Sequence, residues 1–211
     1  MIGKILRKKL KRFSKFLAMP FVALKINPLI ISFLGIPLAL AAFYFVLLGQ
    51  WFEAFAFAGL ASGIDLIDGA IARELKKESL FGNYFETMID KLVELILFAG
   101  FVFYFPLETV FALGFSLITS YAKPRVALVI ITDNHDWPAM GEHAEKLLVL
   151  LAGILLTYFE IAVSGVSIMQ IALWVIIAMT LVGLVQRISY GKKLIKEAEK
   201  KGNILPYLKS K

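Results

Sequence analysis

The sequence predicts an all-α integral membrane protein with six transmembrane helices, preceded by an amphipathic helix at the membrane interface. Three observations predict this fold class: an apolar composition, six separate apolar stretches, and basic residues confined to one set of segments. Of the 211 residues, 59% are hydrophobic, and the mean hydropathy is +0.78, whereas soluble domains are about 45–50% apolar. The chain contains no cysteine, which excludes disulfide and thiolate chemistry.

Each apolar stretch is expected to cross the bilayer, for which a helix needs about 20 residues. The fourth stretch is expected to continue toward residue 131 and the fifth toward residue 163. No linker rich in proline, glycine or serine divides the chain, so we expect one membrane domain over residues 26–191. The expected spans are residues 29–48, 52–72, 84–105, 109–121, 146–158 and 168–185.

The basic residues indicate the orientation of these spans. The chain carries 23 Lys and Arg and a formal net charge of +7, but residues 49–51, 106–108 and 160–167 contain no Lys or Arg. Because short cytoplasmic loops are enriched in basic residues, we expect both termini and the other loops to lie on the cytoplasmic side of the cell membrane.

The two ends of the chain are themselves basic. Residues 1–25 place apolar side chains at helical spacing among lysines, which predicts an amphipathic helix lying on anionic headgroups. A basic segment that only sets the topology is the alternative. Residues 192–211 predict a basic cytoplasmic tail that begins as a helix. The expected partner of these segments is the lipid bilayer and not nucleic acid.

Four carboxylates stand at helical spacing within this apolar chain. Asp65 and Asp68 are three residues apart, and Glu86 and Asp90 are four apart, so each pair shares one helix face. Charged groups at membrane depth are costly and usually functional. Hard divalent cations bind carboxylate and phosphate oxygens, and two such ions can hold a phosphoryl group during in-line displacement. We therefore expect Mg²⁺ or Mn²⁺, as two ions, held against a phosphate.

Small residues and one arginine lie between the carboxylates. Gly69 and Ala72 allow a ligand to approach the backbone, Arg73 can pair with a phosphate through two hydrogen bonds, and Gly82 opens the turn into the next helix. The alternative is a solvated loop in which the carboxylates pair with neighbouring basic residues. The role of Glu94 is left open between supporting Lys91 or Asp90 and reaching a cavity.

The spacing D-x₂-D-G-x₂-A-R-x₈-G-x₃-E-x₃-D resembles the signature of the CDP-alcohol phosphotransferase family, D-x₂-D-G-x₂-A-R-x₈₋₉-G-x₃-D-x₃-D. Seven of the eight fixed positions match, and Glu86 departs from the usual Asp. The layout of six spans after an amphipathic segment is also similar to that family, and it extends the resemblance over most of the chain.

The resemblance implies a metal-dependent transferase of phospholipid synthesis. Family members join the phosphoryl group of a CDP-linked alcohol, usually a CDP-lipid, to the hydroxyl of a second alcohol and release CMP. By this resemblance Asp90 is the general base, and the family also implies a homodimer. The implied metal ligands are Asp65, Asp68, Glu86 and Asp90, and the implied nucleotide-binding residues are Asp65, Asp68, Gly69, Ala72, Arg73 and Gly82.

Basic residues near the ends of two spans predict the kind of acceptor. Lys123, Arg125 and Arg187 lie on the same expected side as the carboxylates. They resemble basic residues of family members that use phosphorylated acceptors such as inositol phosphate or glycerol phosphate. The alternative is that they only obey the topology rule. His135, between Asp133 and Asp136, fits no trusted metal motif and is expected in a surface loop.

Other functions remain open at this point. Serine or a soluble CDP-polyol is an alternative substrate within the same family. A small transporter lined by carboxylates is an alternative from another class, although its carboxylates would then be expected in both halves of the membrane. A member without activity, which only binds nucleotide or lipid, is suggested by Glu86 alone.

Overall fold

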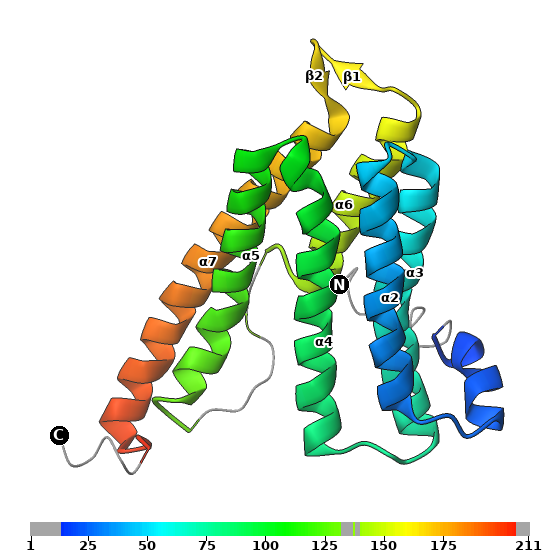
Figure 1. Ribbon diagram of the computed structural model, residues 1–211. Coiled ribbons are helices and arrows are strands. Elements are labelled where there is room, and N and C mark those ends of the chain that lie inside the picture. The colour runs from blue at the N-terminus through cyan, green and yellow to red at the C-terminus, as the bar shows by residue number, and fades with distance from the viewer. Residues whose placement is uncertain (1–13, 132–136, 138–139, 206–211) are drawn as a thin grey trace. The chain divides into compact units, whose positions relative to one another are not determined.

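The structure is a computed structural model that describes residues 14–131, 137 and 140–205. It is mostly helical and divides into two compact units, residues 1–103 and 104–211, which are described separately (Figure 1). The first unit contains a helix over Ser14–Ala23, followed by α2 (Pro28–Leu47), α3 (Trp51–Glu74), α4 (Leu80–Ala99) and the 3₁₀ turn η1 (Gly100–Phe103). The second contains α5 (Pro106–Ala127), α6 (His143–Tyr158), the strands β1 (Ala162–Val163) and β2 (Val166–Ser167), and α7 (Ile168–Lys201).

One helix occupies each of the six expected spans, and α2, α3 and α7 are long and apolar enough to cross a membrane. The number of crossings stays a prediction. The expected continuation of α5 toward residue 131 is wrong, because the helix ends at Ala127 and Val129 pairs with the chain beyond α7. The continuation of α6 is also wrong, because the helix ends at Tyr158 and β1 pairs with β2 in an antiparallel hairpin.

Helix α2 packs against both α3 and α4 and is the central helix of the first unit. It begins where Asn27 Oδ1 accepts a hydrogen bond from Leu29 N at 3.1 Å, with Pro28 in the first helical position. Gly35 marks where the three helices meet. A Cβ at Gly35 would lie 3.1 Å from Val93 Cγ2 of α4 and 3.9 Å from Ala61 O of α3.

The helix over Ser14–Ala23 packs beside the ends of α2 and α3. Ala18 is fully buried against Ile31 and Ile71, and Lys15 Nζ lies 2.9 Å from Glu74 Oε1. These contacts fix its position beside the carboxyl-terminal end of α3. The remainder of the expected amphipathic segment, residues 1–13, lies outside the described residues, and its place at the membrane interface stays a prediction.

In the second unit, α7 packs against α5 and α6. Polar contacts join α5 to α7 along their length: Gln170 Nε2 donates to Glu108 Oε1 at 2.6 Å, and Thr119 Oγ1 donates to Thr180 O at 3.0 Å. Helix α7 ends at Gly202, whose φ of 67° suits the left-handed cap that glycine adopts readily. The chain then turns back, and Leu205 N donates to Val129 O at 3.3 Å.

The packing of α6 on α7 gives a direct test of this arrangement. A Cβ at Gly153 would lie only 2.7 Å from the Cβ of Ala172. We therefore expect Gly153→Ala to destabilise the fold by about 1–3 kcal/mol, because overpacking forces the helices apart. Thermal unfolding of the purified protein in detergent measures the effect as a lower Tm.

Gly114→Ala is the matched control, since a Cβ at Gly114 of α5 meets no atom of the described residues within 4 Å. It should leave the Tm unchanged or raise it, because alanine favours a helix over glycine by up to about 1 kcal/mol. Equal Tm values for Gly153→Ala and the unsubstituted protein would contradict the close packing of α6 on α7.

Candidate active site

A cavity of about 880 Å³ opens in the first unit between the ends of three helices. Its lining includes Asn27 and Pro28 at the amino terminus of α2, Ser79 and Leu80 at the amino terminus of α4, and Arg73 near the carboxyl terminus of α3. The amino terminus of a helix carries free N–H groups and a partial positive charge, which suit phosphate groups. The cavity therefore has the electrostatic character expected of a phosphate site.

The acidic residues expected at the site come together from two helices. Asp65 and Asp68 of α3 and Glu86 of α4 each offer a carboxylate oxygen, and these three atoms lie within 4.8 Å of one another. Asp65 and Asp90 also offer oxygens within 4.8 Å of each other. Glu86 therefore joins the carboxylate cluster, although the family signature has Asp at this position.

Asp68 is the most constrained of these carboxylates, and its side chain is buried. Its Oδ1 accepts a hydrogen bond from Gly69 N at 2.6 Å, and its Oδ2 accepts one from the hydroxyl of Ser32 on α2. A carboxylate held by two donors has a fixed orientation, and its remaining lone pairs are directed. Asp68 is thus set in place by α2 as well as by its own helix.

Gly69 lies beneath two charged groups of the cavity. A Cβ at Gly69 would lie 3.4 Å from Arg73 Nη1 and 3.6 Å from Glu86 Oε1. The guanidinium and the carboxylate thus lie close to the backbone of α3, at distances that a Cβ would fill as ordinary contacts. Ala72, one turn later, also lines the cavity with a small side chain. The small residues of the motif therefore leave open the space between the charged groups.

Gly82 has a structural role that its position in the motif does not reveal. Ser79 caps α4, because its Oγ accepts a hydrogen bond from Gly82 N at 2.9 Å. A Cβ at Gly82 would lie 3.0 Å from that same oxygen. Glycine at this position therefore gives the cap room, and it also lines the cavity.

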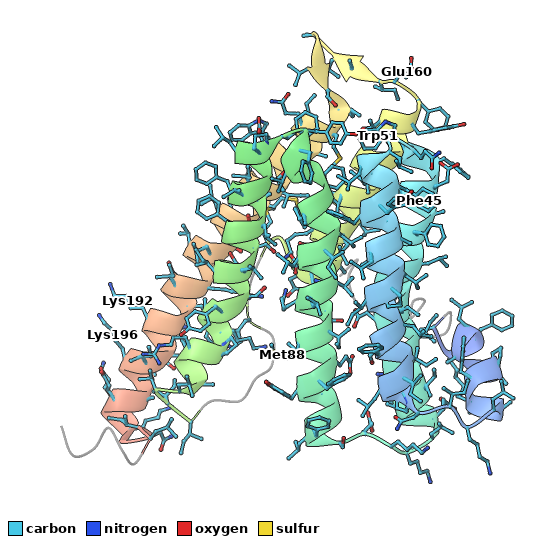
Figure 2. The ribbon with its side chains drawn as sticks, viewed as in Figure 1. Phe45, Trp51, Met88, Glu160, Lys192 and Lys196 are labelled. Carbon is cyan, nitrogen blue, oxygen red and sulfur yellow. The ribbon has the colours of Figure 1, made fainter. Side chains whose placement is uncertain are left out.

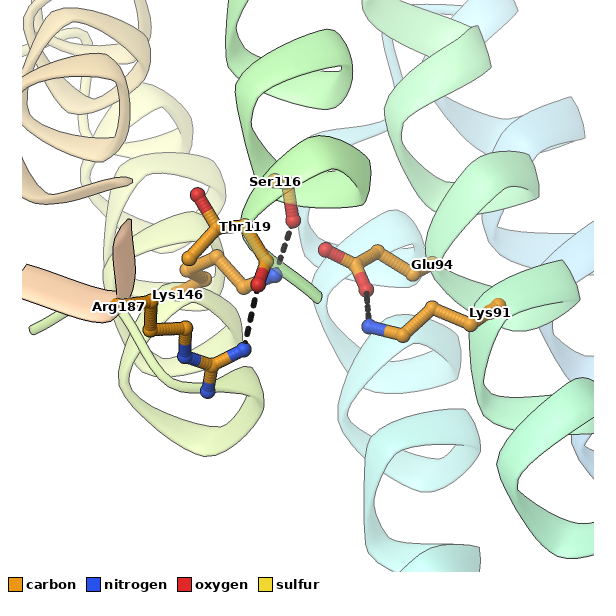
Figure 3. A network of polar contacts seen from close by, with 6 residues as sticks. All are labelled: Lys91, Glu94, Ser116, Thr119, Lys146 and Arg187. Atoms are coloured by element: carbon orange, nitrogen blue, oxygen red, sulfur yellow. Dashed lines mark hydrogen bonds and ion pairs between the residues drawn. The ribbon is translucent and has the colours of Figure 1, made fainter. Parts of the chain in front are cut away.

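The role left open for Glu94 has a structural answer. Its buried carboxylate lies 2.7 Å from Lys91 Nζ, one turn earlier on α4 (Figure 3). Of the alternatives weighed from the sequence, support of Lys91 is therefore the contact observed. A buried carboxylate is costly without such a partner, so Lys91 offsets the burial cost of Glu94 in the turn of α4 that directly follows Asp90.

The three basic residues expected to bind the acceptor phosphate lie in the second unit. Arg125 of α5 and Arg187 of α7 line one groove between these two helices, whereas Lys123 is not among the described residues that line it. Arg187 Nη1 also donates to Thr119 O at 2.6 Å (Figure 3). Asp133, His135 and Asp136 lie outside the described residues.

Sequence reasoning missed two serines that shape the site. Ser32 lies within the first apolar span, where a lone hydroxyl is usually satisfied by the carbonyl of the preceding turn, and it does contact Pro28 O at 3.2 Å. Only the packing of α2 on α3 reveals its contact with Asp68. Ser79 could have been found, because a serine directly before an apolar helical stretch is a common helix-capping residue.

The residues present fit divalent metal ions. The donor set consists of carboxylate oxygens, which Mg²⁺ and Mn²⁺ prefer. Three carboxylates whose oxygens lie within 4.8 Å repel one another, and a bound divalent cation would offset this repulsion. The arrangement can therefore hold one or two cations beside a cavity that suits phosphate.

Comparison with known proteins places this site in a family. The model of the family described as CDP-alcohol phosphatidyltransferase matches residues 25–182. The phosphatidylinositol phosphate synthase of Streptomyces avermitilis is 27% identical over 219 aligned residues, which cover 94% of this chain and 87% of that protein. The archaetidylinositol phosphate synthase of Methanothermobacter thermautotrophicus is 30% identical over 138 residues, covering 57% of this chain and 69% of that protein.

Solved structures show the same fold. The crystal structure of the Mycobacterium tuberculosis phosphatidylinositol phosphate synthase with CDP-DAG bound superposes with a TM-score of 0.70 at 21% identity, covering 85% of this chain and 94% of that one. The same enzyme with manganese and citrate gives a TM-score of 0.67 at 19% identity, covering 84% and 88%. Because the family match spans most of the chain, this protein belongs to the CDP-alcohol phosphatidyltransferase family of membrane-integral, metal-dependent transferases.

Proposed function

We propose that this protein transfers the phosphoryl-lipid group of a CDP-lipid to a hydroxyl of inositol phosphate and releases CMP. The observation that carries the proposal is the meeting of Asp65, Asp68 and Glu86 within 4.8 Å, beside a cavity bounded by two helix amino termini. The relatives' names support the choice of substrates, since two curated relatives make inositol phosphate lipids and one related structure contains CDP-DAG. Glycerol phosphate is the next phosphorylated acceptor to consider.

The four carboxylates are proposed to bind metal ions, and Asp90 is also proposed to act as the general base. Asp65, Asp68, Glu86 and Asp90 hold two Mg²⁺ or Mn²⁺ ions, which neutralise charge on the phosphate oxygens when bound. Asp90 accepts the proton of the acceptor hydroxyl. The acceptor oxygen then bonds to the lipid-side phosphorus, and the bond from that phosphorus to the oxygen of CMP breaks.

The nucleotide and the acceptor are proposed to bind different residues. Asp65 and Asp68 form the nucleotide site together with the small and basic residues of the motif, namely Gly69, Ala72, Arg73 and Gly82. Arg73 pairs with a phosphate through its guanidinium, for which arginine is suited. Lys123, Arg125 and Arg187 bind the phosphate of the acceptor. The common groove lined by Arg125 and Arg187 supports their part in this role.

The proposed placement in the membrane follows the charge pattern. Six helices cross the cell membrane within residues 26–191, residues 1–25 lie at the interface, and residues 192–211 are cytoplasmic. Within the second unit, Glu160 follows α6 near the hairpin, and Lys192 and Lys196 lie toward the opposite end of α7 (Figure 2). This separation supports a cytoplasmic position for the carboxyl-terminal end of α7, and the charge pattern of the loops is the ground for a cytoplasmic active site. We also propose a homodimer, as the family resemblance implies.

The alternatives make different predictions for one assay. Family membership and the meeting of the carboxylates favour a transferase over a transporter. Serine or a soluble CDP-polyol as substrate would appear as a different partner preference in the same reaction. A member without activity would release no CMP with any of them.

The purified protein should release CMP from CDP-diacylglycerol only when Mg²⁺ or Mn²⁺ and the correct acceptor are present. Inositol 1-phosphate should support release, whereas glycerol 3-phosphate, serine and free inositol should support it weakly. Asp90→Asn should lower the rate by about 10²–10⁴-fold, because the general base is lost. Chromatography of CMP measures the rate, and mass spectrometry identifies the lipid product.

Glu197→Gln is the matched control, because within the described part of the chain this exposed residue of α7 is paired only with Lys193, at a long 4.0 Å. Its rate should equal that of the unsubstituted protein. If Asp90→Asn keeps a similar rate, Asp90 is not the base. If no acceptor supports release by the folded protein, the proposed function is wrong in its donor or in its activity.

Ser32 gives a test of the metal site that does not alter a ligand. Ser32→Ala removes a donor to Asp68 Oδ2, and loss of such an outer contact typically weakens metal binding by about 10–100-fold. We expect the Mn²⁺ concentration for half-maximal rate to rise by that order. Ser32→Thr keeps the hydroxyl and should restore it. An unchanged Mn²⁺ requirement in Ser32→Ala would show that Asp68 does not depend on this contact.

The acceptor residues can be tested by the kind of kinetic change. Arg125→Gln and Arg187→Gln should raise the KM for inositol 1-phosphate by at least about tenfold, since a charged hydrogen bond is lost, while the KM for CDP-diacylglycerol stays unchanged. Arg187→Lys keeps the charge and should recover part of the loss. Equal increases in both KM values would indicate a structural effect and contradict binding of the acceptor phosphate.

A further inference from the structure

A groove of about 600 Å³ runs between α5 and α7 in the second unit, and we call it the α5–α7 groove. Most of its lining is apolar, and several of these side chains are exposed: Ile118 is 52% and Ile188 is 59% accessible. Its lining also includes basic side chains. On a membrane-spanning helix such apolar side chains face acyl chains, and basic side chains beside them attract anionic headgroups.

Along one row of α7 the lining changes from apolar to basic, while Arg187 and Glu199 line the groove outside that row. Leu184, Ile188, Lys192 and Lys196 all line the groove, and their spacing of four residues puts them in one row on the helix. The row changes from apolar to basic toward the end of the helix, as Figure 2 shows for the two lysines. On α5 the order is the same, from Ile118 to Arg125.

The length of α7 relates this change to the depth of the membrane. A helix of 34 residues is about 51 Å long, whereas the hydrocarbon core is about 30 Å thick. The last turns of α7, with Lys192 and Lys196, therefore reach the headgroup region or beyond when the helix spans the bilayer. The apolar part of the groove then lies at the depth of the acyl chains.

The basic end of the groove is held in shape by the backbone. Ile130, which follows α5, pairs with Ile204, which follows α7, in an antiparallel bridge. Ile131 N also donates to Asn203 O at 3.3 Å. The bridge connects the ends of both helices that form the groove, so the groove exists before a ligand binds and little ordering is required.

From this order of side chains we propose that the α5–α7 groove binds one anionic phospholipid of the bilayer. An acyl chain lies along Ile118 and Ile188, and the phosphate pairs with Lys192 and Lys196. A free soluble phosphate would gain nothing from the apolar walls, which favours the lipid. Neither lysine has a part in the proposed reaction, whereas Arg125 and Arg187, which also line this groove, are left to the acceptor phosphate.

Trp137 provides a natural reporter for the groove. Its ring lies 3.8 Å from the position of a Cβ on Gly191, which lines the groove. The protein with Trp51→Phe and Trp174→Phe keeps Trp137 as its one tryptophan. In mixed bilayers, brominated phosphatidylglycerol should quench this tryptophan more strongly than brominated phosphatidylcholine. We expect the relative association constant to favour phosphatidylglycerol by about fivefold or more.

Lys192→Gln with Lys196→Gln should bring that ratio close to one, without changing the total quenching by lipid. Lys193→Gln with Lys200→Gln is the matched control, because it removes the same charge from the same helix at residues that are not among the described lining of the groove. The control should keep the preference. Equal circular dichroism spectra establish that each variant is folded.

Three results would overturn the proposal. An equal loss of preference in both double variants would indicate diffuse attraction to the membrane surface. Quenching by neither lipid would show that another part of the protein or a second copy covers the groove. Loss of the preference for phosphatidylglycerol in excess inorganic phosphate, at constant ionic strength, would assign Lys192 and Lys196 to a soluble phosphate.

Discussion

The hydrogen bond from Ser32 to Asp68 is the contact on which the candidate site depends. It joins α2 to α3 at the level where the carboxylates gather. In an apolar bundle a buried carboxylate without donors is very costly. The hydroxyl of Ser32 on α2 therefore has to lie beside Asp68 of α3. The orientation of the Asp68 carboxylate therefore depends on how α2 packs on α3, and a shift of either helix would change both.

Three glycines of the first unit lie where helices or charged side chains come close together. Gly35 lets α2 approach α3 and α4, charged groups lie close to α3 at Gly69, and Gly82 makes room for the cap of α4. At Gly35 and Gly82 a Cβ would lie within 3.1 Å of a neighbouring side chain, whereas at Gly69 it would meet only ordinary contacts. The carboxylates of α3 and α4 can meet only because the helices come this close.

The residues that could be predicted from the sequence are those with local signals. The lengths of the apolar stretches predicted the six helices. Helical spacing placed Asp65 and Asp68 on one face of α3 and put Glu86 on one face of α4 with Asp90. Ser32 could not be predicted, since its partner is 36 residues away and only packing brings them together. The end of α5 was predicted too late, because pairing with the chain beyond α7 replaces apolar helix there.

The length of α7 has a consequence for how its positive charge acts. A flexible basic tail loses conformational entropy when it meets an anionic surface, whereas the lysines of α7 stand on a continuous helix that ends in a glycine cap. Their spacing is set before any encounter, and only the side chains need to be ordered. The attraction should therefore weaken with ionic strength as the Debye length shortens, without any accompanying change in helix content.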